Sequence, residues 1–347
     1  MRCVGLSGKL KVGIVGLGTF GQVHLEAYSG YHRSEIEAIC DLDVKKGEEF
    51  SLKYGCDFYS SYEEMFSEAD IEAVSIATPD FLHREPAVLA AEAGLDILLE
   101  KPMATTVQDA NHIIEAVERA GSTIMIDFHN RFSPPFVALK RSIERGEMGS
   151  PRYIRANLND TIYVPTKMLS WSAKSNVLWF LASHLIDLCR WILSSDPRRV
   201  LCKKGEGVLS SSGIDTPDYY HSLLEFESGA VASLENCWIL PESHPSVYKL
   251  EMEFVGSEGS YSANVSHSNM SRKYTKDRQE NPDMLFDIDL HGRPRGFAVE
   301  SIYHFVDSVM DGERPLVGPE DGLWVTKTIT ALLESARSDS WVDLSQL

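Results

Sequence analysis

The sequence predicts an α/β protein in which a doubly wound parallel sheet is followed by an α+β domain. Three observations support this prediction. The first 128 residues alternate short β-rich runs with helical stretches, the pattern of a parallel sheet covered by helices on both faces. A glycine-rich turn directly follows the first of these runs. Beyond His129, β-rich runs follow one another with only turns between them, as antiparallel meanders do.

The first part contains five β-rich runs that we expect to be strands. They are KVGIVG (11–16), IEAIC (36–40), AVSIAT (73–78), DILLE (96–100) and TIMIDF (123–128). The helical stretches between them lie near 19–30, 43–54, 82–93 and 105–120. Each stretch is long enough to form the right-handed crossover that neighbouring parallel strands require. Residues 1–128 are therefore expected to form one domain.

The second expected domain covers residues 129–347. Its candidate strands are YIRANL (153–158), HSLLEFE (221–227), AVASLENCW (230–238) and KLEMEFVG (249–256). Residues 266–295 are polar and rich in turn-forming residues, so we expect surface loop and edge strand there. Two closing helices are expected near 296–311 and 319–337.

The composition is that of an ordinary folded protein, with 43% hydrophobic and 24% charged residues, which excludes disordered, collagen-like and disulfide-scaffold classes. Asp and Glu (51) outnumber Lys and Arg (33), giving a net charge of −18 that repels nucleic acid and anionic membrane surfaces. The apolar segment 177–193 contains His184, Asp187 and Arg190, so it is expected to be a core helix rather than a membrane span. Neither nucleic acid nor a membrane is therefore an expected partner.

The six cysteines indicate a reducing compartment. Cys3, Cys40, Cys56, Cys189, Cys202 and Cys237 form no CxxC pair, so we predict neither a metal site nor a disulfide framework. The first apolar run is broken by glycines and has no small-residue cleavage site, so it is expected to be a strand and not a secretion signal. These features together predict a cytoplasmic protein with buried free thiols.

The glycine turn GLGTFG predicts a dinucleotide site. Gly16, Gly18 and Gly21 have the GxGxxG spacing after a strand and at the start of a helix, with Thr19 and Phe20 inside the turn. Such glycines let a pyrophosphate approach the helix N-terminus, where free N–H groups and the helix dipole favour anions. This spacing alone is weak, because flavin and S-adenosylmethionine folds use related turns.

Asp41 strengthens the prediction and indicates the cofactor. It ends the second strand 20 residues beyond Gly21, where a carboxylate can accept both hydroxyl hydrogens of the adenosine ribose. The 2′-phosphate of NADP would meet this carboxylate with like charge, and no arginine follows it in DLDVKK. We therefore expect NAD rather than NADP. The counter-argument is that Lys45 or Lys46 could reach a 2′-phosphate if the following helix begins late.

Two further segments follow the carboxyl ends of parallel strands, the edge at which doubly wound folds bind ligands. They are ATPDFLH, with Thr78, Pro79 and His83, and EKP, with Glu100, Lys101 and Pro102. At these residues the sequence resembles the Gfo/Idh/MocA family of sugar and polyol oxidoreductases. HNRF (129–132), SHLIDLCRWIL (183–193), IDTPDYYHSLLEF (214–226) and PEDGLWVTKTITALLESA (319–336) extend the resemblance over nearly the whole chain.

The resemblance implies an N-terminal Rossmann domain that carries NAD(P) and a C-terminal domain with a large, mostly antiparallel open sheet. It also implies a substrate pocket between the domains, and homodimers or homotetramers that form through the large sheet. The family's lysine beside nicotinamide and substrate corresponds to Lys101, and its catalytic histidine corresponds to His184. The acidic residue common four positions before that histidine is replaced by Phe180, and Ala182 stands where glycine is frequent. This departure leaves both the substrate and the usual catalytic triad open.

Oxidation of a secondary alcohol needs a base at the hydroxyl while hydride leaves the same carbon. His184 suits that role at neutral pH, and Phe180, His184, Asp187 and Trp191 would share one face of a helix. We therefore predict that His184 accepts the proton and that Lys101 holds the oxygen, and a share of Lys101 in the proton transfer stays open. Arg131, Tyr163, Trp171 and His221 are further candidates for the pocket, each of which could equally be structural. A cis Lys101-Pro102 bond is also anticipated, because it would aim the lysine at the cofactor.

Three functions remain open at this point. The first is an NAD-dependent oxidoreductase of a sugar, inositol or related polyhydroxy compound. The second is a same-fold enzyme with another task, such as dihydrodiol oxidation, imine reduction or redox-assisted glycoside cleavage. The third is a non-catalytic ligand sensor, or regulatory subunit, that kept the dinucleotide fold. Lys101 and His184 together favour an enzyme, whereas Phe180 mildly favours a sensor.

Overall fold

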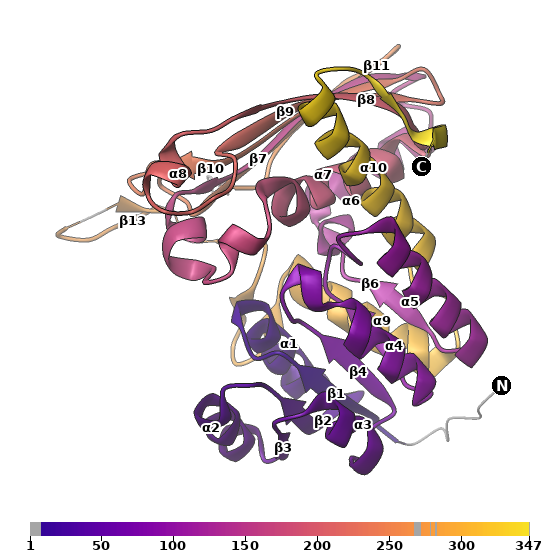
Figure 1. Cartoon of the computed structure of the whole chain (residues 1–347), viewed down its shortest axis with the longest axis vertical. Coiled ribbons are helices and arrows are strands. Elements are labelled where there is room, and N and C mark those ends of the chain that lie inside the picture. Colours follow the sequence, from indigo (N-terminus) through magenta and orange to yellow (C-terminus); the bar gives the residue numbers. More distant parts are fainter. Residues whose placement is uncertain (1–7, 267–271, 278, 282, 347) are drawn as a thin grey trace. The chain divides into compact units, whose positions relative to one another are not determined.

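The computed structural model describes residues 8–266, 272–277, 279–281 and 283–346. Its contacts divide the chain into two units (Figure 1). Unit 1 comprises Met1–His129 and Phe286–Leu323, and unit 2 comprises Asn130–Leu285 and Trp324–Leu347. The sequence analysis assigned 286–323 to the second domain, whereas by contacts these residues belong to unit 1. The functional division at residue 128 stays a prediction.

Unit 1 is built on a six-stranded sheet with the order β3-β2-β1-β4-β5-β6, in which every pair is parallel. The strands are β1 (Leu10–Val15), β2 (Ser34–Cys40), β3 (Asp57–Tyr59), β4 (Ala73–Ile76), β5 (Asp96–Leu99) and β6 (Ile124–Ile126). The predicted Rossmann sheet is thereby confirmed. The strand order reverses between β1 and β4, and ligands bind at such a switch point in doubly wound folds.

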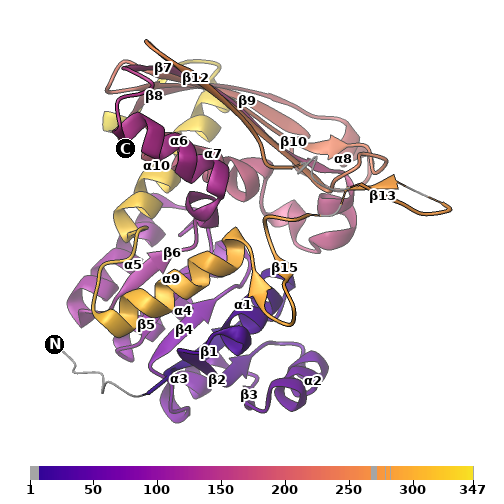
Figure 2. The same cartoon turned by 180° about the vertical axis from the view of Figure 1, so that it is seen from behind.

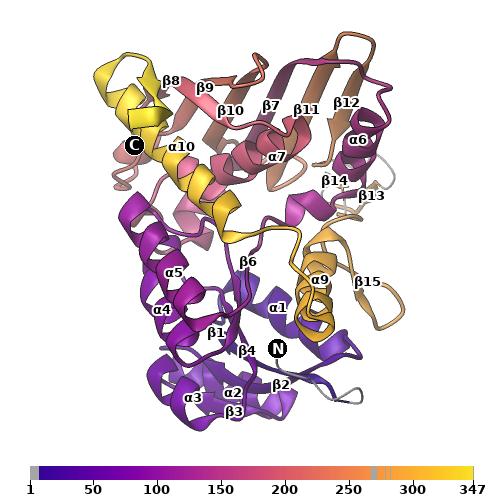
Figure 3. The same ribbon diagram turned by 90° about the vertical axis from the view of Figure 1, so that its right-hand side faces the viewer.

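Helices cover both faces of this sheet. Figure 3 shows α4 and α5 on one face and α9 on the other, where it packs against α1. The helices are α1 (Thr19–Gly30), α2 (Val44–Tyr54), α3 (Tyr62–Glu68), α4 (Arg84–Glu92), α5 (Val107–Ala120) and α9 (Phe297–Asp311), with a 3-10 turn η1 (Asp80–Leu82). β3 and α3 were not predicted, because they are too short to show a clear period. The place of α9 in this unit was not predicted either.

Side-chain contacts explain why α9 belongs to unit 1. The Tyr31 hydroxyl donates to Asp307 Oδ1 over 2.7 Å, and the Tyr31 ring stacks on Tyr303 with centroids 4.1 Å apart. Two short strands, β15 (Ile288–Asp289) and β16 (Pro294–Arg295), precede α9 and pair with each other (Figure 2). Helix α10 (Pro319–Ser338) begins in unit 1 and continues into unit 2.

Unit 2 is built on a seven-stranded sheet with the order β12-β11-β7-β10-β9-β8-β17. The strands are β7 (Pro151–Thr161), β8 (Pro197–Gly205), β9 (Tyr219–Phe226), β10 (Val231–Leu240), β11 (Tyr248–Gly256), β12 (Ser260–Asn264) and β17 (Val342–Asp343). β9 and β10 pair as antiparallel neighbours, as expected, and β8, which was not predicted, pairs with β9. β10 then pairs in parallel with β7 instead of continuing to β11. The sheet is therefore mostly antiparallel, as predicted, whereas an uninterrupted meander is wrong.

One face of the large sheet is covered by α6 (Pro134–Glu144), α7 (Ser183–Leu193) and the later half of α10. The short elements of this unit are η2 (His129–Phe132, which starts in unit 1), η3 (Val164–Met168), η4 (Ser172–Lys174), η5 (Leu178–Ala182), α8 (Val208–Ser211), η6 (Leu344–Gln346) and the pair β13 (Lys273–Tyr274) and β14 (Gln279–Glu280). Parts of the predicted loop 266–295 lie outside the described residues. In the described part of the chain, no helix is long and apolar enough to cross a membrane.

Candidate active site

The glycine turn of unit 1 lies at the switch point between β1 and β4. A Cβ on Gly16, where φ is +91°, would meet the Ala77 carbonyl oxygen at 2.7 Å. A Cβ on Gly21 would meet the Gly16 carbonyl oxygen at 1.9 Å, so this glycine lets α1 pack against the turn. A Cβ on Gly18 would meet no described atom within 4 Å, and no side chain caps α1 there. The turn therefore leaves open space at a helix N-terminus, which fits a pyrophosphate.

Asp41 follows β2, beside this turn. Its Oδ2 accepts the Leu17 N–H over 2.7 Å and its Oδ1 accepts the Asp43 N–H over 2.8 Å, so the backbone fixes the carboxylate. Each oxygen keeps a lone pair for a ribose hydroxyl. Thr19 is exposed at the start of α1, and Phe20 is half-buried. The residues present therefore fit the adenosine end of NAD.

The loops after β4 and β5 are tied together by His83. Its Nδ1 lies 2.7 Å from the Pro102 carbonyl oxygen and its Nε2 lies 3.0 Å from the Thr78 carbonyl oxygen. The Thr78 Oγ1 is buried and has no hydrogen-bond partner among the described residues. That orphaned hydroxyl suits a polar ligand atom at the carboxyl edge of the sheet. His83 holds main chain here, and its predicted contact with the cofactor stays a prediction, as does that of Pro79.

Lys101 lies directly after β5 and is buried, with 6% of its surface exposed. Its backbone N–H donates to the Glu100 carboxylate over 3.1 Å, and its Nζ lies 5.9 Å from the centroid of the Phe20 ring. The Lys101-Pro102 peptide bond is cis, as anticipated. Lys101 is thus buried beside the glycine turn, and its predicted contact with the cofactor stays a prediction.

A buried polar cluster, formed by His24, Glu100 and Asp127, lies next to Lys101. His24 Nε2 is 3.1 Å from Glu100 Oε1 and 3.6 Å from Asp127 Oδ2. On the other side of the ring, His24 Nδ1 is 2.7 Å from Ser75 Oγ, which is 3.0 Å from the Tyr28 hydroxyl. The Ser301 hydroxyl lies 2.7 Å from Asp127 Oδ1. Helices α1 and α9 and strands β4, β5 and β6 thus all contribute to one network.

Burial sets the charges of this cluster. It raises the pKa of Asp127 to about 7, an effect that the negative charge of Glu100 increases. Burial alone would raise the pKa of Glu100, but the hydrogen bond with His24 outweighs burial and holds the pKa of Glu100 below its usual value. Burial lowers the pKa of His129 to about 4, so this ring is neutral at neutral pH. Two carboxylates in one dry site therefore differ in their protonation.

Neither His24 nor Asp127 was among the residues predicted for the site. His24 lies three residues beyond Gly21, and Asp127 ends the run TIMIDF, so a carboxylate at the carboxyl end of a predicted strand was a usable signal. The side chains of His24, Glu100 and Asp127 also have a spacing that could hold a metal ion. Their ligand atoms already take part in the hydrogen bonds above, and the expected absence of a metal stays a prediction.

In unit 2, His184 is the second residue of α7 and is 5% exposed. The residues before it, Leu178–Ala182, form a π-helical turn, which in other proteins often marks a functional site. The Asn176 Oδ1 accepts the backbone N–H groups of Leu178 and Trp179 at the start of this turn. Because the turn is π-helical, the predicted single α-helical face from Phe180 through His184 to Trp191 is interrupted before His184.

Arg131 lies in η2 and is bound to Asp187 of α7, one turn beyond His184. Its Nε donates to Asp187 Oδ2 over 2.9 Å and its Nη2 to Oδ1 over 2.5 Å. Both side chains are buried, at 4% and 0% exposure. Such a bidentate pair fixes geometry as well as charge. Arg131 therefore orients α7, and its predicted contact with substrate stays a prediction.

Phe180 belongs to an aromatic group under the large sheet. Its ring centroid is 6.1 Å from that of Trp171 and 5.7 Å from that of Trp238, which is fully buried. Tyr163, by contrast, is 40% exposed, with the Lys167 ammonium 5.9 Å from its ring. Trp171 is thus brought together with Phe180, whereas the Tyr163 ring contacts Lys167.

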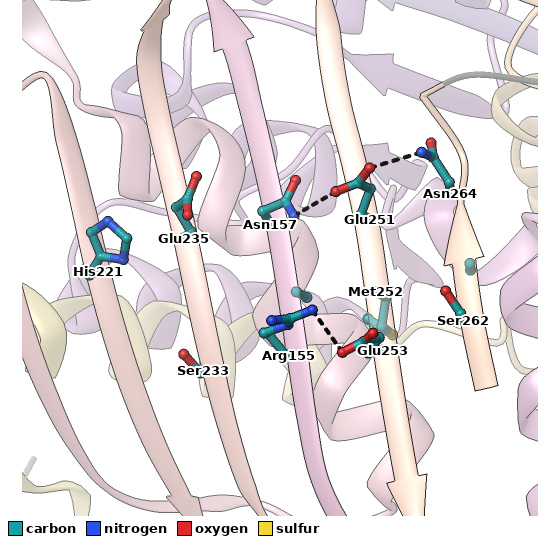
Figure 4. Close-up of a pocket in the computed structure, with 12 residues that line it drawn as sticks. Arg155, Asn157, His221, Ser233, Glu235, Glu251, Met252, Glu253, Ser262 and Asn264 are labelled. Atoms are coloured by element: carbon teal, nitrogen blue, oxygen red, sulfur yellow. Dashed lines mark hydrogen bonds and ion pairs between the residues drawn. The ribbon is translucent and has the colours of Figure 1, made fainter. Parts of the chain in front are cut away.

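His221 lies on the opposite face of the large sheet. Figure 4 shows its side chain in a row with Glu235, Asn157 and Glu251, on the face that α7 does not cover. This face contains a shallow depression of about 520 Å³, in which Asn157 Nδ2 donates to Glu251 over 3.2 Å. The inclusion of His221 among the pocket candidates with His184 is therefore wrong. The reason is strand alternation, since His221 and the buried Tyr220 point to opposite faces.

Both units match one family of known proteins. Residues 10–128 match the oxidoreductase family with an NAD-binding Rossmann fold, and residues 136–262 match the C-terminal domain of the same Gfo/Idh/MocA group.

The full length of the chain also resembles characterised relatives. It is 26% identical to levoglucosan dehydrogenase of Pseudarthrobacter phenanthrenivorans over 97% of this chain and 99% of that protein. It is 24% identical to myo-inositol 2-dehydrogenase of Thermotoga maritima over 90% and 92% of the two chains. The crystal structure of GenD2 from gentamicin A biosynthesis in complex with NAD has the same fold, with a TM-score of 0.87, 23% identity, and coverage of 99% and 98%. The chain therefore belongs to the Gfo/Idh/MocA family of oxidoreductases, whose first domain is an NAD-binding Rossmann fold.

Proposed function

We propose that this oxidoreductase transfers a hydride between NAD and a secondary alcohol of a sugar, inositol or related polyhydroxy compound. The observation that carries the proposal is the buried Lys101 at the carboxyl edge of the Rossmann sheet, beside a glycine turn that has room for a pyrophosphate. The names of the relatives, levoglucosan dehydrogenase and myo-inositol 2-dehydrogenase, support this class of substrate.

Two side chains would act on the substrate hydroxyl. His184 would accept the proton of the hydroxyl, and Lys101 would hold the oxygen and stabilise its developing negative charge. NAD, when bound, takes the hydride from the carbon that carries the hydroxyl. Arg131 would act through its bidentate pair with Asp187, which fixes α7 and with it the position of the His184 ring.

Phe180 would shape the substrate preference. An aromatic ring can neither transfer a proton nor bind a hydroxyl as a carboxylate does, and its contacts with Trp171 and Trp238 support an apolar wall at this position. A sugar with a C–H-rich face or a deoxy position there would bind better than one that carries a hydroxyl. His184 would therefore work without a carboxylate from residue 180.

Asp41 would select NAD over NADP. Its carboxylate is held by the Leu17 and Asp43 N–H groups, so it cannot easily turn away from a 2′-phosphate. Two unit charges ~4 Å apart at an effective dielectric of about 20 repel by roughly 4 kcal/mol, and a third of that is about tenfold in affinity. Leu42, the next residue, is 90% exposed and adds no positive charge.

The exposed face of the large sheet would bind a second copy of the chain, giving a homodimer or homotetramer. Its centre carries paired polar groups such as Arg155 and Glu253, 2.9 Å apart, while Tyr153 at one end is 46% exposed. Exposed tyrosine and arginine are typical of interfaces. Light scattering should therefore give the mass of two or four chains, and Tyr153→Arg should give single chains, whereas Leu52→Arg on exposed α2 should not. A single-chain mass for the wild type would contradict the proposal.

The proposed location is the cytoplasm. The described cysteines, Cys40, Cys56, Cys189, Cys202 and Cys237, are all free thiols, and burial raises the pKa of each, which keeps them protonated and unreactive. Free thiols of this kind persist in a reducing compartment.

The experiment that tests the function is NADH formation from NAD with a panel of sugars, inositols, anhydrosugars and polyols. We expect turnover with at least one compound and preference for one that lacks a hydroxyl on one face. A ligand sensor on the same fold would bind NADH but form none from any compound. An imine reductase would oxidise NADH when an imine is supplied and would leave alcohols unchanged. The behaviour of a sensor or of an imine reductase would contradict the proposal.

A further inference from the structure

The His24, Glu100 and Asp127 cluster has a hydrogen-bond pattern that fixes where its protons are. The Ser301 hydroxyl has one hydrogen, yet its oxygen lies 2.7 Å from Asp127 Oδ1 and 2.9 Å from the Ala298 carbonyl oxygen. If Asp127 is protonated, it donates to Ser301, and Ser301 donates to the carbonyl, so both contacts are hydrogen bonds. If Asp127 is ionised, only one of them can be. The geometry therefore favours a protonated Asp127, in line with its raised pKa of about 7.

The other hydrogen bonds of the cluster can all form when Glu100 carries a negative charge. The Tyr28 hydroxyl can donate to Ser75, Ser75 to His24 Nδ1, and His24 Nε2 to the ionised Glu100. With Asp127 protonated and Glu100 ionised, all of these hydrogen bonds can form. The cluster therefore holds the negative charge of Glu100.

This charge lies beside Lys101. Glu100 accepts the backbone N–H of Lys101 over 3.1 Å, so the carboxylate also fixes the main chain from which the lysine extends. The positive charge of Lys101 helps to lower the pKa values of Glu100 and Asp127. Because electrostatic attraction is mutual, the cluster must favour the charged form of Lys101 by the same interaction.

We propose that Glu100, Asp127 and His24 are positioning residues that hold a negative charge beside Lys101, and so set the pH range in which Lys101 stays charged. The inference deepens the proposed function, on which it rests for the role of Lys101 in catalysis. These residues act through Lys101 and do not themselves meet the substrate.

The cluster is also expected to change charge as the pH rises. Above about pH 7, Asp127 loses its proton and the cluster gains a second negative charge, which strengthens the attraction for the Lys101 ammonium. His129 also interacts with Lys101, and its pKa of about 4 leaves it neutral in this range. The network thus opposes loss of the Lys101 proton most strongly in the alkaline range.

The test is a direct titration of Lys101 in the intact protein. Lysine carrying carbon-13 at the ε position gives an NMR signal that reports protonation, and the Lys101 signal is identified by its loss in Lys101→Arg. Glu100→Gln should move the titration midpoint down by about one pH unit or more, because an opposite charge nearby is worth that much. Asp127→Asn, which keeps nearly the same shape but removes the charge that Asp127 carries above about pH 7, should also move it down.

The matched control is Glu72→Gln. Glu72 carries the same charge but precedes β4, at the amino edge of the same sheet, where it accepts the Lys11 N–H. Its charge is screened by solvent, so the Lys101 midpoint should move by less than about 0.2 unit. If Glu100→Gln does not fold, Asp127→Asn alone decides the matter.

The outcomes separate this inference from the proposed function. If the midpoint falls in the Glu100 or Asp127 variant and not in the control, the inference holds, whether or not a substrate turns over. If all midpoints coincide, the cluster is structural and the inference is wrong. When a substrate is known, the alkaline limb of kcat against pH should move with the NMR midpoint, whereas a structural role would lower kcat equally at every pH.

Discussion

Alanine at Gly18 and alanine at Gly21 should differ in their effects on the stability of the protein and on NADH binding. Gly18 has φ −67° and ψ −165°, which alanine adopts readily, and its new Cβ would meet no described atom within 4 Å. Gly18→Ala should therefore leave the free energy of unfolding within about 1 kcal/mol of the wild type, on the side of a gain. In Gly21→Ala the Cβ would overlap the Gly16 carbonyl oxygen at 1.9 Å, so about 1 to 3 kcal/mol or more of stability should be lost.

The binding of NADH should distinguish the same two variants. The open space at Gly18 is where the pyrophosphate would lie, so a methyl group there should cost about 1 to 3 kcal/mol of affinity, or roughly 5- to 150-fold in Kd. Urea unfolding of the free protein and calorimetric titration with NADH measure the two quantities separately. The reasoning would be refuted if Gly18→Ala bound NADH like the wild type, or if it lost as much stability as Gly21→Ala.

Three further predictions concern single charges. Asp41→Ala should lower the ratio of kcat/KM for NAD to that for NADP by about tenfold, whereas Asp43→Ala, which removes the adjacent cap of α2, should leave the ratio unchanged and cost about 1 kcal/mol of stability. Asp187→Asn should lower the free energy of unfolding in urea by about 3 to 5 kcal/mol, because it breaks the buried pair with Arg131. Glu334→Gln, which breaks an exposed pair, should lower it by less than about 0.5 kcal/mol. Equal losses of stability in the two variants would contradict the account. Asp127 binds a proton more tightly in the folded than in the unfolded protein, because its folded pKa is about 7 against an ordinary 3.8, so its contribution to stability is lost as the pH rises toward 7. The buried neutral His129 has the opposite effect on the pH dependence of stability, so the variant must be compared with the wild type at each pH. Between about pH 5 and 7, the free energy of unfolding of Asp127→Asn should rise by about 2 kcal/mol relative to that of the wild type. A difference in unfolding free energy that is the same at every pH would refute the assignment.

The sequence predicted the parts of the fold that depend on local pattern. The strand runs from 11–16 to 123–128 and the glycine turn specify the Rossmann sheet, because each carries its own period or turn residues. The parallel pairing of β7 with β10 was not predictable in this way. These strands lie far apart in the chain, and the sequence between them shows no preference for one neighbour over another.

In the candidate site, as in the fold, the sequence predicted the residues that stand in local motifs. Gly16, Gly18, Asp41 and Lys101 stand in local motifs and lie at the expected edge of the sheet. The cluster behind Lys101 joins His24 to Glu100 across 76 residues, and no local spacing relates them. Similarly, the π-helical turn at Leu178–Ala182 altered the helix face expected from Phe180 to His184, since a 3.6-residue period assumes an unbroken α-helix.

The central claim is that Lys101 and His184 act together on a substrate hydroxyl while NAD takes the hydride. The most direct measurement is single-turnover NADH formation by the wild type, Lys101→Ala and His184→Ala with the best compound of the panel, alongside the Kd for NADH. The account predicts that each variant loses about 10²- to 10⁴-fold in rate while its Kd for NADH stays within about threefold of the wild type. Near wild-type rates in both variants would contradict the account and place the chemistry on other residues.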